Sequence, residues 1–326
     1  MCKIPLFNKI METKMLMQPS PSTINQMYTE LGTSETKLDL DVKILKEWMR
    51  KQPHLPNPDD DENIIDEKRL KTFLLMCKNS LEKTKVMLDQ HYTVKLSAPE
   101  YFSKWDPTLP EIVRTIKQSC FLPLPNPTRE GHRVGILRIR TEEVGNVVFD
   151  DFIKLCFMTL DLRISKLDTC KKEIGIIDCT NMSMNYVAAF IPCIKKIIES
   201  VFGAYPLRTH GIHLINTNSF VNPLINLSLT ILKKKVAGRM INHKSIEDLK
   251  NYIEPSVLPL DYGGTYPKTS DEIIDDWYDE LKKHREWLIA QSSIVADNSK
   301  RPKNSINHSD DVGNDIEGSF RKIEVD

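Results

Sequence analysis

The sequence predicts an α/β protein in which an all-helical N-terminal domain precedes a domain with a mainly parallel sheet. Between residues 38 and 116, apolar residues recur every three or four positions, which is typical of amphipathic helices. After Gly131, short runs of Ile, Val and Leu alternate with helical segments in the order β-α-β-α-β-α. Short apolar strands joined by helical crossovers indicate parallel pairing, because parallel strands cannot be joined by a tight turn.

Changes in composition divide the chain into four parts. Residues 1–36 are expected to be poorly ordered, and residues 37–125 to form the helical domain, which the proline-rich linker 123–127 brings to an end. Residues 131–290 are expected to form the α/β domain. Residues 291–326 are rich in Ser, Asn, Asp and Lys, and this composition predicts a disordered tail.

The helical domain is predicted from its apolar repeats and their boundaries. A first helix begins near Leu38 and stops at the proline-rich segment 53–58. The acidic run Asp59–Glu62 suits the start of the next element, because negative charge is favourable at a helix N-terminus. Residues 66–96 predict two helices, the second capped by Asn79 or Ser80. Residues 109–116 predict another short helix.

The α/β domain is predicted from the change of pattern after Gly131. Apolar runs predict strands at 134–139, 173–178 and 211–216, and wider apolar repeats predict helices at 149–165, 186–202, 246–253 and 271–290. The turn Gly263-Gly264 follows a short apolar segment and is expected to be structural.

Composition excludes several classes of function. Lys+Arg and Asp+Glu are both 45, so a net charge of zero gives no general attraction to nucleic acid. The seven cysteines are scattered without a CxxC pair, which argues against a disulfide framework or zinc knuckle and favours free thiols in a reducing compartment. The first twenty residues lack the apolar core of a signal peptide, and no apolar run approaches the ~20 residues of a membrane span. A cytoplasmic protein is expected.

The chain also lacks the common catalytic and cofactor motifs. No glycine-rich phosphate loop and no G-x-S-x-G elbow occurs, so we expect no enzymatic activity and no cofactor. Asp178, at the end of a predicted strand, is either a catalytic acid or a turn residue, and no partner base is evident. His210 and His213 fall on opposite faces of a strand, so His213 is expected in the core, His210 at the surface, and no metal site is predicted.

The segment 205–239 has an unusual order of properties. A short strand and a polar turn precede the apolar stretch Phe220–Leu232, which ends in Lys233, Lys234, Lys235 and Arg239. This pattern fits a lid that covers an apolar cavity and rests on an anionic membrane. It also fits an ordinary core helix whose basic end is solvated and complements the helix dipole.

Apolar residues outnumber polar anchors around this segment. Ligand pockets are mostly apolar with few polar groups, but a solid core has the same composition. The candidate cavity residues are Ile174, Ile176, Asp178, Ile197, Val201, Ile212, Leu214, Phe220, Ile225 and Leu229.

Two sequence blocks resemble the CRAL-TRIO lipid-transfer family, in particular its alpha-tocopherol transfer protein and retinaldehyde-binding protein branch. The two blocks are residues 205–216, YPLRTHGIHLIN, and residues 258–264, LPLDYGG. Two further motifs support the resemblance: Phe73-Leu74 with residues 78–83, KNSLEK, in the helical domain, and Ile176-Ile177-Asp178 in the central strand. The resemblance covers about residues 40–285. It implies a helical domain and an α/β lipid-binding domain whose apolar cavity is closed by a mobile gate helix, here about residues 218–232.

The resemblance also implies a phosphoinositide headgroup site beside the gate. The matching positions here are Arg208, Lys235 and Arg239, while His210 stands where the tocopherol transfer protein has an arginine. The arginines of the family's first motif are absent from 73–77, FLLMC, and Met182 replaces an aromatic residue after Asp178. These departures imply a reshaped pocket, so the ligand need not be tocopherol.

The resulting hypothesis is a non-enzymatic lipid carrier that acts at the surface of membranes in the cytoplasm. It would hold a tocopherol-, retinoid- or phospholipid-like molecule and exchange it at phosphoinositide-containing membranes, with no metal or nucleic-acid partner. One alternative is a phosphoinositide-sensing or protein-docking module without net transfer. Another is an enzyme that acts on a small lipid through Asp178.

Overall fold

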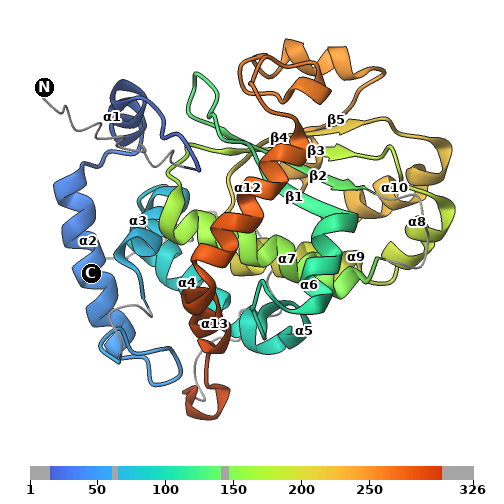
Figure 1. Cartoon of the computed structure of the whole chain (residues 1–326). Helices are drawn as coiled ribbons and strands as arrows, with labels where there is room; N and C mark the ends of the chain where they lie inside the picture. The colour runs from blue at the N-terminus through green and yellow to red at the C-terminus, as the bar shows by residue number, and fades with distance from the viewer. Residues whose placement is uncertain (1–14, 61–64, 141–146, 303–326) are drawn as a thin grey trace, which may run out of the picture.

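A computed structural model of the 326-residue chain describes residues 15–60, 65–140 and 147–302. The N-terminal half of this structure is helical, as the apolar repeats predict (Figure 1). Ser34, Asp66 and Ser80 cap the second, third and fourth helices through their side chains. The helices are α1 (Pro21–Glu30), α2 (Glu35–Arg50), α3 (Glu67–Met76), α4 (Leu81–Ser97), α5 (Pro99–Phe102) and α6 (Pro110–Gln118).

The second half contains a five-stranded sheet of order β1-β2-β3-β4-β5. Strands β2 to β5 are parallel, which confirms the predicted mainly parallel sheet, and β1 pairs with β2 in the antiparallel sense. The sequence does not predict the short edge strands β1 and β5. Strand β1 ends at Pro123, so it lies within the segment 37–125 that is expected to form the helical domain. The strands are β1 (Ser119–Pro123), β2 (Arg133–Ile139), β3 (Glu173–Asp178), β4 (Thr209–Ile215) and β5 (Met240–Asn242).

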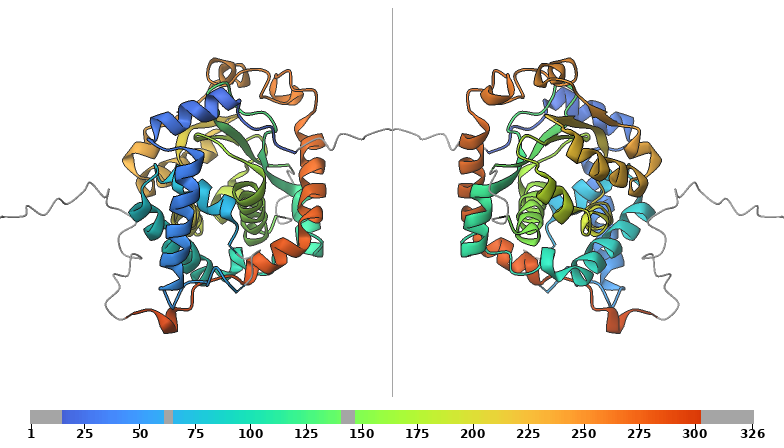
Figure 2. Two further views of the ribbon diagram at one scale, coloured as in Figure 1. Left: turned by 90° about the vertical axis from the view of Figure 1, so that its left-hand side faces the viewer. Right: turned by 90° about the vertical axis from the view of Figure 1, so that its right-hand side faces the viewer.

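Helices connect the parallel strands and cover the sheet. Seen from the side, α7 lies between the N-terminal helices and α12 (Figure 2). The elements are α7 (Phe149–Leu162) with the π-helical turn η1 (Arg163–Leu167), α8 (Met184–Phe190), α9 (Ile194–Ala204), η2 (Ser219–Val221), α10 (Asn222–Ile231), α11 (Lys234–Ala237), η3 (Ile246–Asn251), η4 (Leu260–Tyr262), α12 (Ser270–Lys283), α13 (Arg285–Ser293) and η5 (Asn298–Lys300).

Two predicted helices are each divided in the structure. The segment 186–202 contains α8 and α9, because Pro192 lacks the amide hydrogen that a continuous helix would need. The segment 271–290 divides into α12 and α13 at His284, which ends one helix and begins the other. The predicted helix at 246–253 is the shorter 3-10 helix η3, held by a capping box between Ser245 and Asp248. No described helix combines the length and the apolar character needed to cross a bilayer.

The described parts of both terminal segments are ordered, in contrast to the prediction from composition. In 15–36, Leu16 and Met27 are buried, and the Met17 amide donates to the Pro125 carbonyl at 3.0 Å. In 291–302, Asp297 N–H donates to the His54 carbonyl at 2.8 Å, and Arg301 forms a bidentate pair with Asp89. These contacts with distant residues cannot be read from local composition. Residues 1–14 and 303–326 lie outside the described residues, as does part of the acidic run 59–62.

A buried ionic network lies below the amino ends of the strands. Arg133 makes a bidentate pair with Asp168, which also accepts a hydrogen bond from Arg163 at 2.7 Å. Arg163 in turn pairs with Glu173 at the start of β3. A second buried pair, Arg69–Asp161 at 2.7 Å, joins α3 to α7. Buried charges are tolerated only when they are paired, so these contacts fix the strand ends and the helical domain relative to each other.

Two neighbouring glycines in the sheet provide a test of local packing. A methyl group at Gly135 would lie 2.8 Å from the ring of Phe121, whereas one at Gly175 would meet no atom within 4 Å. Gly135→Ala should therefore lower the free energy of unfolding by about 1–3 kcal/mol through overpacking. Gly175→Ala should be neutral or raise it by about 0.4–1 kcal/mol, because alanine restricts the unfolded chain. Urea unfolding of both variants checks this, and equal destabilisation by both would contradict it.

Candidate ligand-binding site

The strand register assigns each residue of the sheet to one of two faces. Ile174 pairs with Val134 and Gly211, and Ile176 pairs with Ile136 and His213. Because side chains alternate along a strand, these residues and Asp178 share one face. Ile212 and Leu214 pair with Gly175 and Ile177 and lie on the other face. The predicted cavity residues of the strands are thus divided between both faces, and their contact with a ligand stays a prediction.

The two faces differ in how well they are packed. On the face of Ile174, which we call the packed face, the central side chains are 0–2% exposed: Val134, Ile136, Ile174, Ile176 and His213. On the opposite face, which we call the open face, several central apolar residues are only half-buried although strands flank them: Leu137, Ile177, Ile212 and Met240. Half-buried apolar residues in the middle of a covered sheet indicate incomplete packing above them.

Gly175 locates this incomplete packing. It lies in the central strand, between Gly135 of β2 and Ile212 of β4. An added Cβ atom would point toward the open face and meet no atom within 4 Å, and Gly175 itself is half-buried. There is therefore empty space directly above the middle of the sheet, on the face that carries Ile212 and Leu214.

A separate cleft of about 950 Å³ lies between α4, α9 and the end of α10. A volume of this size suits a small-molecule site. Ile197, Val201, Ile225 and Leu229 are not among its lining residues. The wall contains the apolar residues Val94, Ala98, Ile198, Phe202, Ile231, Leu232 and Val236, together with the cations Lys195, Lys196, Lys233 and Arg301.

The predicted gate segment is helical, with one buried and one exposed side. Its helix α10 ends at Ile231 and packs against α9. Val221 and Leu224 are buried and Ile225 is half-buried, whereas Phe220 is 47% and Leu229 38% exposed. The segment therefore places two large apolar side chains at the surface, one before the start of α10 and one near its end.

The predicted headgroup residues lie close to the amino ends of the parallel strands. Arg208 precedes β4, and Arg239 precedes β5 and donates from Nη1 to the Thr209 carbonyl. Burial, followed by the positive charges of Lys172 and Arg239, lowers the pKa of His210. Lys235 is exposed on α11, which ends at Ala237. Lys235 and Arg239 are four positions apart, but they do not lie on one helix face because Arg239 is outside the helix.

Lys172 belongs to this basic group but was not identified from the sequence. Burial lowers its pKa, and the neighbouring charges of Arg208 and Arg239 lower it further. The available signal was position: Lys172 directly precedes β3 as Arg208 directly precedes β4 and Arg239 precedes β5. Residues that precede adjacent parallel strands meet at one edge of the sheet.

Asp178 is held as an ionised structural residue. Burial alone would raise its pKa, but hydrogen bonds from Thr180, Asn216 and Tyr262 lower it below the ordinary value. Tyr262 donates to Oδ2 at 2.7 Å, while Asn216 donates to Oδ1 at 3.0 Å. A carboxylate saturated by donors is a weak base, so this geometry favours the turn role over the catalytic role.

The two histidines of β4 differ as expected. His213 is buried, and its Nδ1 lies 2.8 Å from Nε2 of His243. His210 is exposed and lies near His132, with ring centroids 4.3 Å apart.

Comparison with known families agrees with this architecture. Residues 117–264 match the model described as CRAL/TRIO domain, and residues 34–112 match the model described as Pinta-like, UBA domain. Residues 117–264 of this chain are thus similar to a CRAL/TRIO domain. This domain includes the whole sheet, α7 to α11 and the basic residues at the strand ends.

Individual relatives are distant. The human alpha-tocopherol transfer protein-like protein is 26% identical over 230 residues, covering 69% of this chain and 65% of that protein. Rat clavesin-1 is 24% identical over 251 residues, covering 76% of this chain and 70% of that protein. The crystal structure of Sfh5 aligns with a TM-score of 0.47 and 14% identity, covering 78% of this chain and 92% of that one. The chain thus spans just under two thirds of the tocopherol transfer protein-like relative.

The hydrogen bond from Tyr262 to Asp178 predicts a pH-dependent contribution to stability. Because Asp178 has a lowered pKa in the folded state, its contribution is present above the unfolded pKa and is lost as pH falls through the folded pKa. Tyr262→Phe should lower the free energy of unfolding by about 1.5–3 kcal/mol at pH 7, because the bond involves a charged acceptor. The deficit should shrink at acidic pH. Urea unfolding at both pH values checks this, and a constant deficit would contradict it.

Proposed function

We propose that this protein binds a small hydrophobic lipid above the open face of its sheet and exchanges it at anionic, phosphoinositide-containing membranes. The observation that carries the proposal is the empty space over Gly175, within a half-buried apolar surface of a CRAL/TRIO domain. The name of one relative, alpha-tocopherol transfer protein-like, supports a lipid of this class. The protein would act peripherally, from the cytoplasm.

The chemistry of the open face suits an apolar ligand. Its central residues Leu137, Ile177, Ile212 and Met240 carry no ionisable group. Burial of apolar ligand surface contributes about 25 cal/mol per Å², so a molecule of lipid size is held against water without polar contacts. Release then requires a second apolar phase, which a bilayer provides.

The position of α10 supports its role as a gate. The helix follows Asn216, which ends the strand region with φ of +54°. Its last residues border the 950 Å³ cleft, so that end is not closely packed against α4. A helix anchored by Leu224 at one end and bordered by a cleft at the other has room to move, and its exposed Phe220 and Leu229 are suited to contact lipid.

The basic residues support attachment to an anionic surface. Arg208, Arg239, Lys235 and the additional Lys172 are positioned to bind phosphate groups. A cation near an anionic bilayer contributes about 1 kcal/mol. His210 has a lowered pKa, so at neutral pH it would act as a hydrogen-bonding group rather than as a charge.

A carrier fits the site better than an enzyme. Asp178, the one acid considered for catalysis, already accepts hydrogen bonds from Thr180, Asn216 and Tyr262. It lies on the packed face, opposite the space above Gly175. Turnover of a lipid that is lost on changing Asp178, with ligand binding intact, would instead support an enzyme.

Filling the space above Gly175 tests the ligand site. Gly175→Leu should abolish uptake of a fluorescent tocopherol or phospholipid, and Gly175→Ala should reduce it less, because the larger side chain occupies more of the space. Neither variant should have an unfolding midpoint below that of the original protein. Ile176→Leu, on the packed face, is the matched control and should leave uptake unchanged. Full uptake by folded Gly175→Leu would rule out the site.

Charge reversal tests attachment to the membrane. Lys172→Glu and Lys235→Glu should each weaken sedimentation with phosphatidylinositol-bisphosphate vesicles at least about fivefold, because each removes a favourable contribution of about 1 kcal/mol. Lys51→Glu, at an exposed position after α2, should bind as the original protein does.

A transfer assay between donor and acceptor vesicles separates carriage from sensing. The original protein should move labelled lipid, and Leu229→Ser should slow this transfer without preventing vesicle binding. Transfer unaffected by changes at Leu229, Lys172 and Lys235 would contradict the gate model. Vesicle binding without any transfer would instead support the sensing module.

A further inference from the structure

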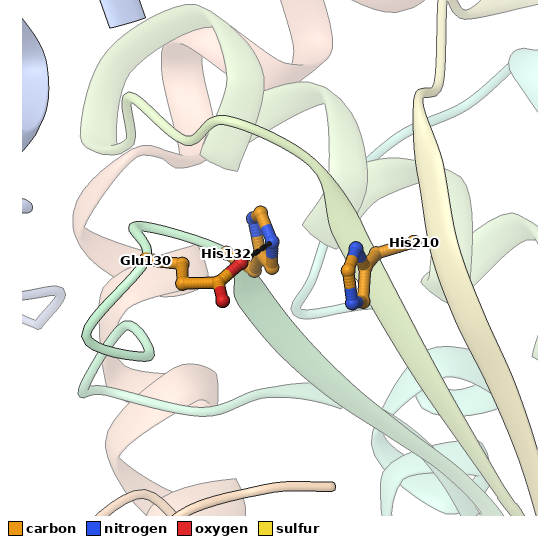
Figure 3. Close-up of side chains that lie close together, drawn as sticks. All are labelled: Glu130, His132 and His210. Carbon is orange, nitrogen blue, oxygen red and sulfur yellow. Dashed lines mark hydrogen bonds and ion pairs between the residues drawn. The ribbon is translucent and has the colours of Figure 1, made fainter. Parts of the chain in front are cut away.

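Glu130, His132 and His210 bring three potential metal ligands together at the amino ends of β2 and β4 (Figure 3). One donor atom from each side chain lies within 4.8 Å of the others, and the described residues contain no second group of this kind. His132 Nε2 is 3.0 Å from Glu130 Oε2, and the two imidazole rings lie 4.3 Å apart. In Figure 3 this nitrogen lies between the carboxylate and His210.

A tight turn fixes two of the three side chains. The Thr128 amide donates to the His132 carbonyl at 2.9 Å, and the His132 amide donates to Thr128 Oγ1 at 3.0 Å. Gly131 has φ of +80°, a conformation that favours glycine, and an added Cβ would lie 2.8 Å from Thr23. The turn is therefore held by the backbone and by α1, and Glu130 and His132 project from a rigid base.

A β-bulge directs the third side chain. Glu173 pairs with Thr209 and Ile174 pairs with Gly211, so His210 is the extra residue of β4. Bulges change the direction of a side chain and are frequent at functional sites. Here the bulge leaves His210 outside the regular pairing and next to His132.

His132 is the buried member of this group. Its side chain is 3% exposed, and within the described structure its Nδ1 has no hydrogen-bond partner. Nε2 contacts Glu130, so a shift of the proton to Nδ1 would turn the Nε2 lone pair toward the carboxylate and His210.

We propose that Glu130, His132 and His210 form a binding site for a zinc-like divalent transition metal ion. Two imidazoles and one carboxylate are a donor set that Zn²⁺ accepts, with a fourth position open to water or an anion. Mg²⁺ and Ca²⁺ prefer oxygen ligands and should bind poorly. Zinc–ligand distances of about 2.0–2.2 Å require the exposed Glu130 and His210 to move toward the buried His132.

The positive charges around the site favour an anion as the fourth ligand. Lys172 and Arg239 act electrostatically on His210, and they disfavour a lone divalent cation. An anion at the open position would offset this repulsion, so inorganic phosphate should strengthen metal binding. This site is independent of the lipid space, which lies over Gly175 farther along the sheet.

Metal titration of the full chain tests the site. After removal of metal by a chelator, Zn²⁺ titrated in competition with a chromogenic chelator should bind with one tight equivalent per chain. Glu130→Gln and His210→Asn alter exposed side chains and should remain folded, and each should weaken binding at least tenfold. Co²⁺ should give visible bands without thiolate charge transfer, which separates this site from the seven cysteines.

The pair His284–Glu280 is the matched control. Its Nε2–Oε1 distance is 3.1 Å, close to that of His132–Glu130, and it is not part of a described group of three ligands. His284→Asn should leave Zn²⁺ affinity unchanged. Any of three results would overturn the proposal. Zinc affinity could be unaffected by His210→Asn, it could fall as much with His284→Asn as with His210→Asn, or the Co²⁺ spectrum could show thiolate charge transfer. None of these outcomes depends on lipid uptake.

Discussion

The parallel pairing of β3 with β4, including the bulge at its start, determines the arrangement of the rest of the α/β domain. If the pairing register of a strand shifts by one residue, every side chain of that strand moves to the opposite face of the sheet. Because the bulge places Gly211 opposite Ile174, His213 lies on the packed face, where its Nε2 would be only 2.8 Å from a Cβ at position 211. A larger residue at position 211 would therefore require the His213 ring to move. The same register places Ile212 beside Gly175 on the open face and leaves His210 free to turn toward His132.

The buried ionic network gives this edge of the sheet its fixed geometry. Arg133 donates to Asp168 and to the carbonyl oxygens of Leu124, Pro125 and Met17, so one guanidinium joins β2, the preceding linker and the N-terminal segment. Such networks contribute little net stability after desolvation, but an arrangement that separated one partner would leave a buried charge unpaired and would be strongly disfavoured. Lys172 and His132 directly precede Glu173 and Arg133, which belong to this network. Their backbone positions are therefore fixed by the network.

Much of the fold could be predicted from local pattern, whereas the site depended on register. The helical repeats, the parallel strands and the family resemblance of residues 205–216 were visible in the sequence, and the structure and family match confirm them. The division of Ile176 and Ile212 between two faces was not visible, because it depends on pairing between separate strands. Long-range packing also produces the empty space over Gly175 and brings His210 close to Glu130 and His132. No local sequence motif indicates either feature.

The connection between β4 and β5 explains why the predicted gate residues and the predicted headgroup residues belong to one segment. A parallel crossover must leave the carboxyl end of one strand and return to the amino end of the next. Here α10 follows Asn216 at the first end, and Arg239 precedes β5 at the second. Lys235 and Arg239 therefore lie at the returning end of the segment that carries Phe220 and Leu229. In the proposed function, a phosphate bound at that end would affect the position of α10, and a single stretch of backbone would couple membrane attachment to access to the open face.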